Sequence, residues 1–188
     1  MSLSHITRIL DQIVRIVAMI GCTAIIVLVI VTVYDVLTRY FGVPKVFGLN
    51  STQLQESQYW AHATLFAFVM AWAYTKQTHV RIDLVRDLFG RRAKYVIEMV
   101  CILIFLMPFA TISGVYSWQY AVRSFASGEV SASTIGLTNL WLLKSTLVVM
   151  FAMLTLAGIS HFLKCVDGLL GNHDDDPTAV SNAIGGGH

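Results

Sequence analysis

Four long stretches without a charged residue constrain this chain more than any other feature of its sequence. They hold 19, 19, 24 and 19 residues and run over 16–34, 57–75, 99–122 and 145–163. A helix of 19 residues extends about 28 Å, close to the ~30 Å hydrocarbon thickness of a bilayer. Charged residues make up only 13% of the chain, about half of their usual share in a soluble domain. The sequence therefore predicts an all-α membrane protein with four transmembrane helices.

The four stretches belong to one predicted transmembrane domain, residues 1–170. Its helices are placed at about 13–34, 56–75, 97–122 and 139–164. The first is too long for the ~7–15-residue core of a signal peptide, so it is interpreted as a retained helix. Residues 171–188 are polar or small, with an acidic run at Asp174–Asp176, and predict a disordered tail.

The positions of Lys and Arg predict the orientation. Nine of the 13 lie in the N-terminal arm, in the loop between the second and third spans, or at the C-terminal end. The other four lie in the two remaining connections or at the adjoining span ends. Because positive residues are retained on the cytoplasmic side, both termini and the middle loop are expected in the cytoplasm.

Two segments outside the spans have the periodicity of surface helices. In the N-terminal arm, Leu3, Leu10 and Val17 share one side with other apolar residues, while polar residues take the other side. This pattern predicts an amphipathic arm in the headgroup region. In the inner loop, apolar residues at helical spacing predict a short interfacial helix that Gly90 ends: Ile82, Val85, Leu88 and Phe89.

Small residues four apart form stripes on two of the predicted spans. The second span carries Ala63, Ala67 and Ala71, and the third carries Ser113, Ser117 and Ala121. Such stripes allow close helix packing, either inside the bundle or against a partner. Pro108 lies within the third span and predicts a modest kink there.

Charged and aromatic residues gather at the predicted outer ends of the spans. Asp35 and Arg39 have the spacing of an ion pair, which would either close the helix end or contact another subunit. Lys144 either snorkels to the headgroups or pairs with an acid, for which Glu129, Asp35 and Glu56 are the candidates. Trp60 and Trp141 are expected to anchor the helices at the interface.

The sequence carries no set of residues that predicts chemistry. His62 and His161 are the histidines within the spans, but they are predicted near opposite faces and could not share one haem iron. The three cysteines are widely spaced and are interpreted as packing residues. No catalytic residue, metal site, cofactor or nucleic-acid partner is expected in this chain.

Several segments between and beside the spans resemble, in the right order, the small membrane (Q) subunit of tripartite ATP-independent periplasmic (TRAP) transporters. The matching segments are Asp35–Gly42, Glu56–Trp60, His79–Asp83, Gly128–Ser131, Gly136–Leu137 and Trp141–Ser145. The chain departs from the family where Thr138 replaces a frequent proline and where Gln53–Glu56 replaces an aromatic-acid run.

The resemblance implies a three-part importer of carboxylate-type solutes in a bacterial inner membrane. A periplasmic solute-binding receptor (P subunit) would deliver the solute to a large membrane (M) subunit that uses an ion gradient, usually sodium. This chain, surrounded by lipids, would be a scaffold for the M subunit and would not bind substrate. Interface or structural roles would fall to the motif residues Asp35, Arg39, Glu56, Trp60, His79, Arg81, Asp83, Glu129 and Lys144. The alternative function is that of a four-helix membrane cytochrome b-like redox subunit.

Overall fold

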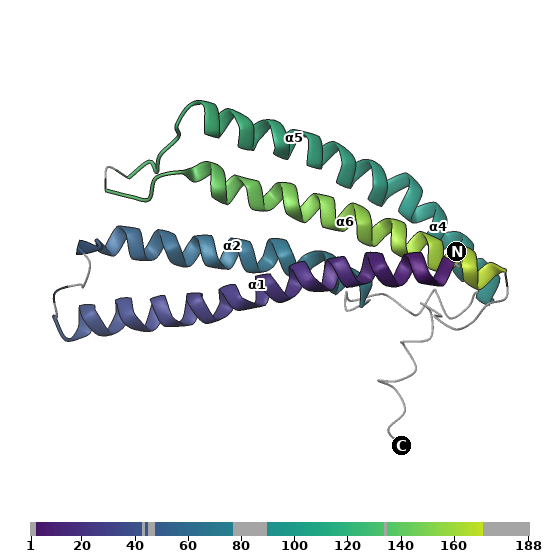
Figure 1. Cartoon of the computed structure of the whole chain (residues 1–188), viewed down its shortest axis with the longest axis horizontal. Helices are drawn as coiled ribbons and strands as arrows, with labels where there is room; N and C mark the ends of the chain where they lie inside the picture. Colours follow the sequence, from purple (N-terminus) through teal and green to yellow (C-terminus); the bar gives the residue numbers. More distant parts are fainter. Residues whose placement is uncertain (1–2, 43, 45–47, 77–89, 134, 171–188) are drawn as a thin grey trace, which may run out of the picture.

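The computed structural model describes residues 3–42, 44, 48–76, 90–133 and 135–170, and in this part of the chain it contains helices and no strands. Long helices lie side by side in an elongated bundle (Figure 1). They are α1 (Leu3–Tyr40), α2 (Ser51–Thr75), α4 (Arg91–Cys101), α5 (Met107–Ala126) and α6 (Leu140–Leu169), with a π-helical turn, η2 (Ile102–Leu106), between α4 and α5. The predicted interfacial helix at Ile82–Phe89 and the predicted tail at 171–188 lie outside the described residues.

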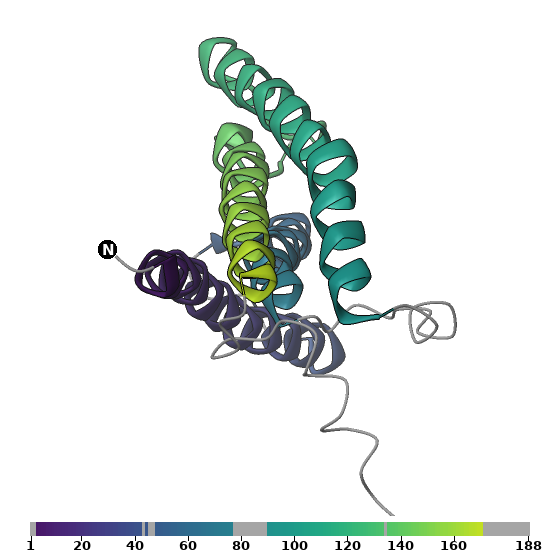
Figure 2. The same ribbon diagram turned by 90° about the vertical axis from the view of Figure 1, so that its right-hand side faces the viewer.

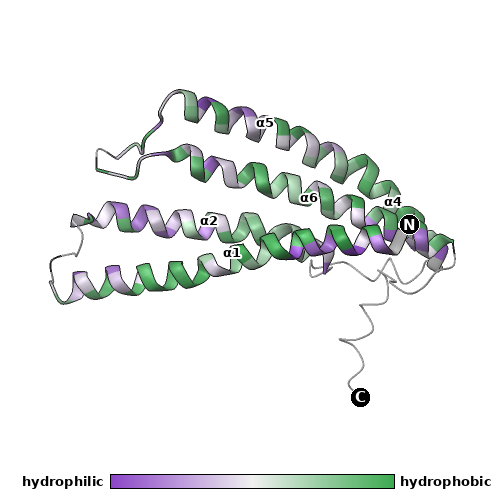
Figure 3. Ribbon diagram, viewed as in Figure 1, coloured by the Kyte–Doolittle hydropathy of each residue, from purple (hydrophilic) through white to green (hydrophobic). Residues whose placement is uncertain are grey.

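Among the described residues, three helices are long and apolar enough to cross a membrane: His5–Tyr40, Arg92–Ala126 and Leu140–Leu169. They overlap the first, third and fourth predicted spans. The second predicted span lies in α2, which is long enough but less apolar, as its paler and purple stretches show (Figure 3). Since α2 packs against both α1 and α6, fewer of its residues need to be apolar to face lipid. Its crossing remains a prediction.

The N-terminal arm is continuous with the first span. The two form one helix of 38 residues, α1, which at 1.5 Å per residue is about 57 Å long. Thr7, Val14 and Ala18 are buried on one side of this helix, and the first turns of α1 pack against α6. The amphipathic pattern of the arm therefore includes a face that contacts another helix.

The three helices α1, α2 and α6 meet at a small core. It consists of Val14, Ala71 and Ala157, all fully buried, with larger apolar side chains around them. The alanines allow the helices to approach closely, and Ala71 belongs to the small-residue stripe predicted on the second span. The helix formed by α4, η2 and α5 lies on the far side of α6 from α1 (Figure 2).

Pro108 is the second residue of α5 and lies two positions after the last residue of the π-helical turn. A proline has no N–H to donate, and its ring clashes with the carbonyl of the residue four positions earlier in an α-helix. In η2 the Met107 N–H donates instead to the carbonyl of Ile102, five residues earlier, which widens the helix just before the proline. The helix curves through this region (Figure 2), where the sequence predicts a kink.

Candidate functional site

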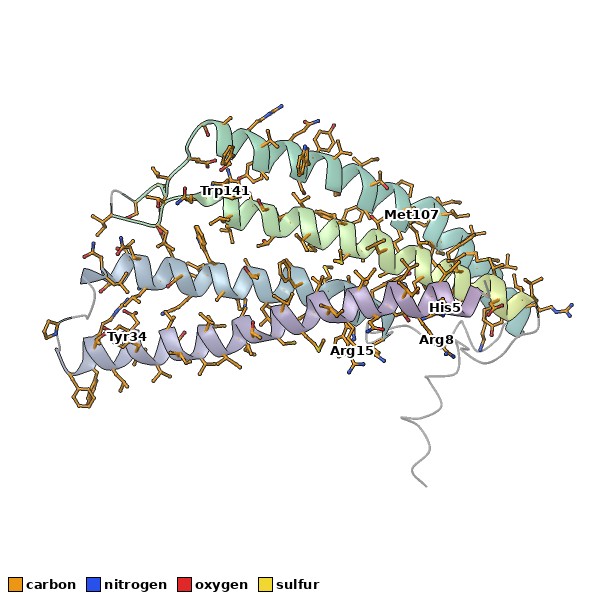
Figure 4. All side chains as sticks on the ribbon, in the orientation of Figure 1. His5, Arg8, Arg15, Tyr34, Met107 and Trp141 are labelled. Atoms are coloured by element: carbon orange, nitrogen blue, oxygen red, sulfur yellow. The ribbon has the colours of Figure 1, made fainter. Side chains whose placement is uncertain are left out.

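The polar contacts between helices form groups at the two ends of the bundle. At the loop end, α1 is followed by α2 and α5 is followed by α6, and Tyr34 and Trp141 lie toward this end (Figure 4). At the terminal end, α1 begins, α6 finishes, and His5 and Arg8 are found (Figure 4). At the loop end, polar contacts join α2 to the connection between α5 and α6. At the terminal end, they join α1 and α4 to α6.

Glu56 of α2 holds the connection between α5 and α6 at the loop end. Its carboxylate accepts hydrogen bonds from the Ser131 hydroxyl and, at 2.5 Å, from the backbone N–H of Leu137. Gly136 allows this approach, because a Cβ there would lie 2.6 Å from Glu56 Oε1 and 2.5 Å from Ser131 Oγ. Three of the motif segments thus meet in one contact.

Lys144 lies beneath the same connection and is almost fully buried. Its ammonium group binds the Glu129 carboxylate and lies 3.8 Å from the centre of the Tyr120 ring. The sequence allowed Lys144 either to snorkel to the headgroups or to pair with an acid, and in the structure it pairs with Glu129. The hydrogen bond from Lys144 lowers the pKa of Glu129 below its ordinary value. Trp141 is half-buried and packs edge-on against Phe125, with ring centres 5.3 Å apart.

Asp35 and Arg39 form an ion pair of 2.6 Å between Asp35 Oδ2 and Arg39 Nη2. The Asp35 side chain is 6% exposed and the Arg39 side chain 44%. With its amide oriented to satisfy the hydrogen bonds, Gln55 of α2 accepts from Arg39 Nη2 at 2.7 Å. The pair therefore closes the end of α1 and also joins α1 to α2.

At the terminal end, Asp11 of α1 binds two residues of α6. Its Oδ1 accepts from the buried Ser160 hydroxyl at 2.6 Å, and its Oδ2 binds the Lys164 ammonium group. The sequence places Asp11 on the polar face of the arm, without a partner. The missed signal is that Ser160 and Lys164 are four residues apart and so lie on one face of α6.

A second group at the terminal end joins α4 to α6 and is here named the His161 triad: Glu98, His161 and Cys165. His161 Nε2 lies 3.0 Å from Glu98 Oε2, and Cys165 Sγ lies 3.6 Å from the same oxygen. Glu98 and His161 border a cavity of about 520 Å³, whose walls also include Tyr74, Cys101 and several apolar side chains of η2 and α5. Sequence reasoning missed Glu98, which is 63 residues from His161.

The two histidines within the predicted spans have different surroundings. His62 is exposed and lies edge-on to Phe66, with ring centres 4.6 Å apart. His161 is buried and lies edge-on to Tyr74, with ring centres 5.7 Å apart. His62 therefore contacts a residue of its own helix, whereas His161 contacts residues of α2 and α4.

The other residues predicted from the sequence are the inner-loop motif, Trp60 and the small-residue stripes. His79, Arg81 and Asp83 lie outside the described residues. Trp60 is half-buried near the loop end of α2. Four members of the small-residue stripes are buried: Ala67, Ala71, Ser117 and Ala121. The other two, Ala63 and Ser113, are half-buried.

Large apolar side chains remain exposed along two helices. On α1 they recur from Ile9 to Tyr40, and on α5 they include Phe109, Tyr116 and Trp118, each more than half exposed. Figure 3 shows α1 as largely apolar along its loop-end half. Surfaces of this extent on a helical bundle are suited to lipid or to a partner protein.

Comparison with known proteins identifies one family. A family model described as "Tripartite ATP-independent periplasmic transporters, DctQ component" matches residues 28–168. Comparisons with curated proteins and with solved structures found no match. The matched range includes the loop-end contacts, the His161 triad and the helices from the second half of α1 to nearly the end of α6.

Proposed function

Because the chain belongs to the DctQ component family of TRAP transporters, we propose that this small membrane subunit is a fixed scaffold for the large ion-coupled membrane subunit. The family match over residues 28–168 is the observation that carries the proposal. It does not favour the cytochrome alternative.

The ties between helices support a rigid role. Glu56 joins α2 to the α5–α6 connection, Asp35 and Arg39 join α1 to α2, and Asp11 joins α1 to α6. These contacts lie at both ends of the bundle, so the helices are held against sliding along one another. A moving element would instead need two packing arrangements of similar free energy.

The exposed apolar faces of α1 and α5 support a role beside other membrane components. One such face would contact the M subunit and the remainder would contact lipid. The interfacial Trp60 and Trp141 and the basic inner loop, which includes Arg81, would resist vertical displacement. In the proposed transporter, the loop end faces the periplasm and the terminal end faces the cytoplasm.

The transported solute and the driving ion belong to the partners in this proposal. A periplasmic receptor would select a carboxylate-type solute, and the M subunit would couple its uptake to sodium. This subunit, in the bacterial inner membrane, would bind neither. Purified and reconstituted alone, it should therefore show no solute uptake.

Disulfide cross-linking to the M subunit tests the scaffold role. Single cysteines would replace Phe66 on α2 or Tyr116 on α5, both exposed, after the exposed Cys22 and Cys101 have been changed to serine. Each would be paired with cysteines in the static domain of the M subunit. Uptake of the solute bound by the cognate receptor should stay near its uncross-linked level.

The reduced form of each cross-linked complex is the matched control. If cross-linking abolishes uptake and reduction restores it, the contact must slide during transport and the subunit is not a fixed scaffold. A cross-link between the M subunit's own static and moving domains should block uptake and shows that the assay detects immobilisation.

A further inference from the structure

We propose that the His161 triad is a binding site for a divalent transition-metal ion of the Zn²⁺ class. The inference concerns Glu98, His161 and Cys165, and it is independent of the scaffold role. It replaces the expectation from the sequence that the chain has no metal site. A carboxylate, an imidazole and a thiolate are all ligands of zinc in proteins.

The spacing of the three ligand atoms fits a tetrahedral ion. Zinc lies ~2.0–2.2 Å from nitrogen and oxygen ligands and ~2.3 Å from sulfur, so tetrahedral ligand atoms are about 3.3–3.6 Å apart. Here Glu98 Oε2 lies 3.0 Å from His161 Nε2 and 3.6 Å from Cys165 Sγ. One ligand atom from each of the three residues lies within 4.8 Å of the other two, so shifts of a few tenths of an ångström to about 1 Å would complete the arrangement.

The packing of α4 against α6 holds the ligands in place. His161 and Cys165 are one helical turn apart and so share a face of α6. Tyr95, three residues before Glu98, is fully buried against Gly168, where a Cβ would lie 2.8 Å from the tyrosine ring. This close contact sets the position of α4 that brings Glu98 to the two α6 ligands.

Burial and charge favour a cation at this position. The side chains of His161 and Glu98 are 5% and 15% exposed, and Cys165 is fully buried. A carboxylate and a thiolate together in such a place repel each other and lose hydration, whereas a divalent cation bound between them would offset both costs. The metal would displace the thiol proton to solvent, so its affinity should rise with pH.

The neighbouring cavity leaves room for a fourth ligand of the ion. Three protein ligands leave one tetrahedral position, as in catalytic zinc sites, whereas structural sites have four. The cavity of about 520 Å³ is bordered by Glu98 and His161 and has room for water or a small solute next to the ion. The site would brace α4 against α6 and retain one exchangeable position.

Cobalt(II) binding to the full chain, purified in detergent without a polyhistidine tag, tests the site. Tetrahedral cobalt bound by a thiolate has strong visible bands and a sulfur-to-metal charge-transfer band in the near ultraviolet. The chain should show both at one cobalt per molecule, and Zn²⁺ should displace the cobalt and abolish the bands. Cys165→Ser should lose the charge-transfer band, and Glu98→Gln should weaken cobalt binding at least tenfold.

The chain offers matched controls for the substitutions of Cys165 and His161. Cys22→Ser, which changes an exposed cysteine outside the triad and the cavity, is the control for Cys165→Ser, and His62→Gln is the control for His161→Gln. These controls should keep the full cobalt spectrum. Where Cys165→Ser does not fold, the wild-type spectrum and the Glu98→Gln titration decide the question.

Three results would overturn the proposal. The wild-type chain could bind no cobalt with a thiolate spectrum, in which case the triad is a hydrogen-bonded contact between α4 and α6 only. Alternatively, the charge-transfer band could persist in folded Cys165→Ser, or binding could remain unchanged in Glu98→Gln, which would place the metal elsewhere.

Discussion

The ion pair of Asp35 and Arg39 has one partner excluded from solvent and one in contact with it. The Asp35 side chain is 6% exposed, whereas that of Arg39 is 44% exposed. When Asp35 is replaced, the guanidinium group can turn toward water or headgroups. When Arg39 is replaced, the buried carboxylate loses its cation and cannot be hydrated in compensation.

We therefore expect unequal effects from the two single substitutions. Arg39→Gln should destabilise the chain by about 1–3 kcal/mol, and Asp35→Asn by less. The double variant should be more stable than the sum of the single effects predicts. The measurements are the thermal midpoint in detergent and the yield of the assembled transporter. Additive losses would show that the two residues act independently.

The pair of Glu129 and Lys144 should make stability depend on pH. The hydrogen bond from Lys144 lowers the pKa of Glu129 in the folded chain from its ordinary value of 4.5. A lowered folded pKa stabilises the fold fully above the ordinary value, and this contribution is lost as the pH falls through the folded pKa. The difference in thermal midpoint between wild type and Glu129→Gln should therefore be largest near neutral pH. It should disappear as the pH falls below about 4. A difference that stays constant over this range would contradict the pairing.

At the scale of the helix, close approach depends on glycine at a few positions. A Cβ at Gly21 of α1 would lie 2.6 Å from the Cβ of Phe68 on α2, a distance that requires the two helices to move apart. A Cβ at Gly114 of α5 would lie 3.5 Å from the Cβ of Phe151 on α6, which is ordinary contact. Substitution of Gly114 by alanine is therefore a matched control for the same substitution at Gly21.

Gly21→Ala should lower stability by about 1–3 kcal/mol through overpacking. Gly114→Ala should leave stability unchanged or raise it by up to about 1 kcal/mol, because alanine is the better helix former. Thermal unfolding of both variants in the same detergent provides the comparison. If the two variants unfold alike, the approach of α1 to α2 is looser than the structure indicates.

At the scale of the whole molecule, the path of α2 decides the topology. The sequence predicts four crossings, and α2 is the helix that lies outside the three most apolar ones. If α2 crosses, Lys45 and Lys94 lie on opposite sides of the membrane. If it does not, they lie on the same side.

A reporter that is active only in the periplasm distinguishes these arrangements. Inserted near Lys45 or Ala126 it should be active, and inserted near Lys94 or at the C-terminus it should be inactive, because nine of the 13 positive residues lie in the segments predicted inside. A reporter that fluoresces only in the cytoplasm should give the reverse pattern at the same positions. Activity of the periplasmic reporter at Lys94 would exclude the four-span arrangement.

The sequence by itself determined the class of the protein and its family. Hydrophobic length is a property of a continuous segment, so α1, the α4–α5 helix and α6 could each be predicted from their own residues. The family motifs are short segments in a fixed order, such as Glu56–Trp60 and Gly128–Ser131, and they too are read locally. Helix existence and family therefore needed no knowledge of packing.

Only the tertiary structure decided which polar groups meet. Glu56 and Leu137 are 81 residues apart, Asp11 and Lys164 are 153, and Glu98 and His161 are 63. Periodicity assigns a residue to a face of its own helix, but it does not say whether that face meets water, lipid or another helix. The packing of α1, α2 and α4 around α6 supplied the partners, because a buried charge is stable only where the fold brings it a partner.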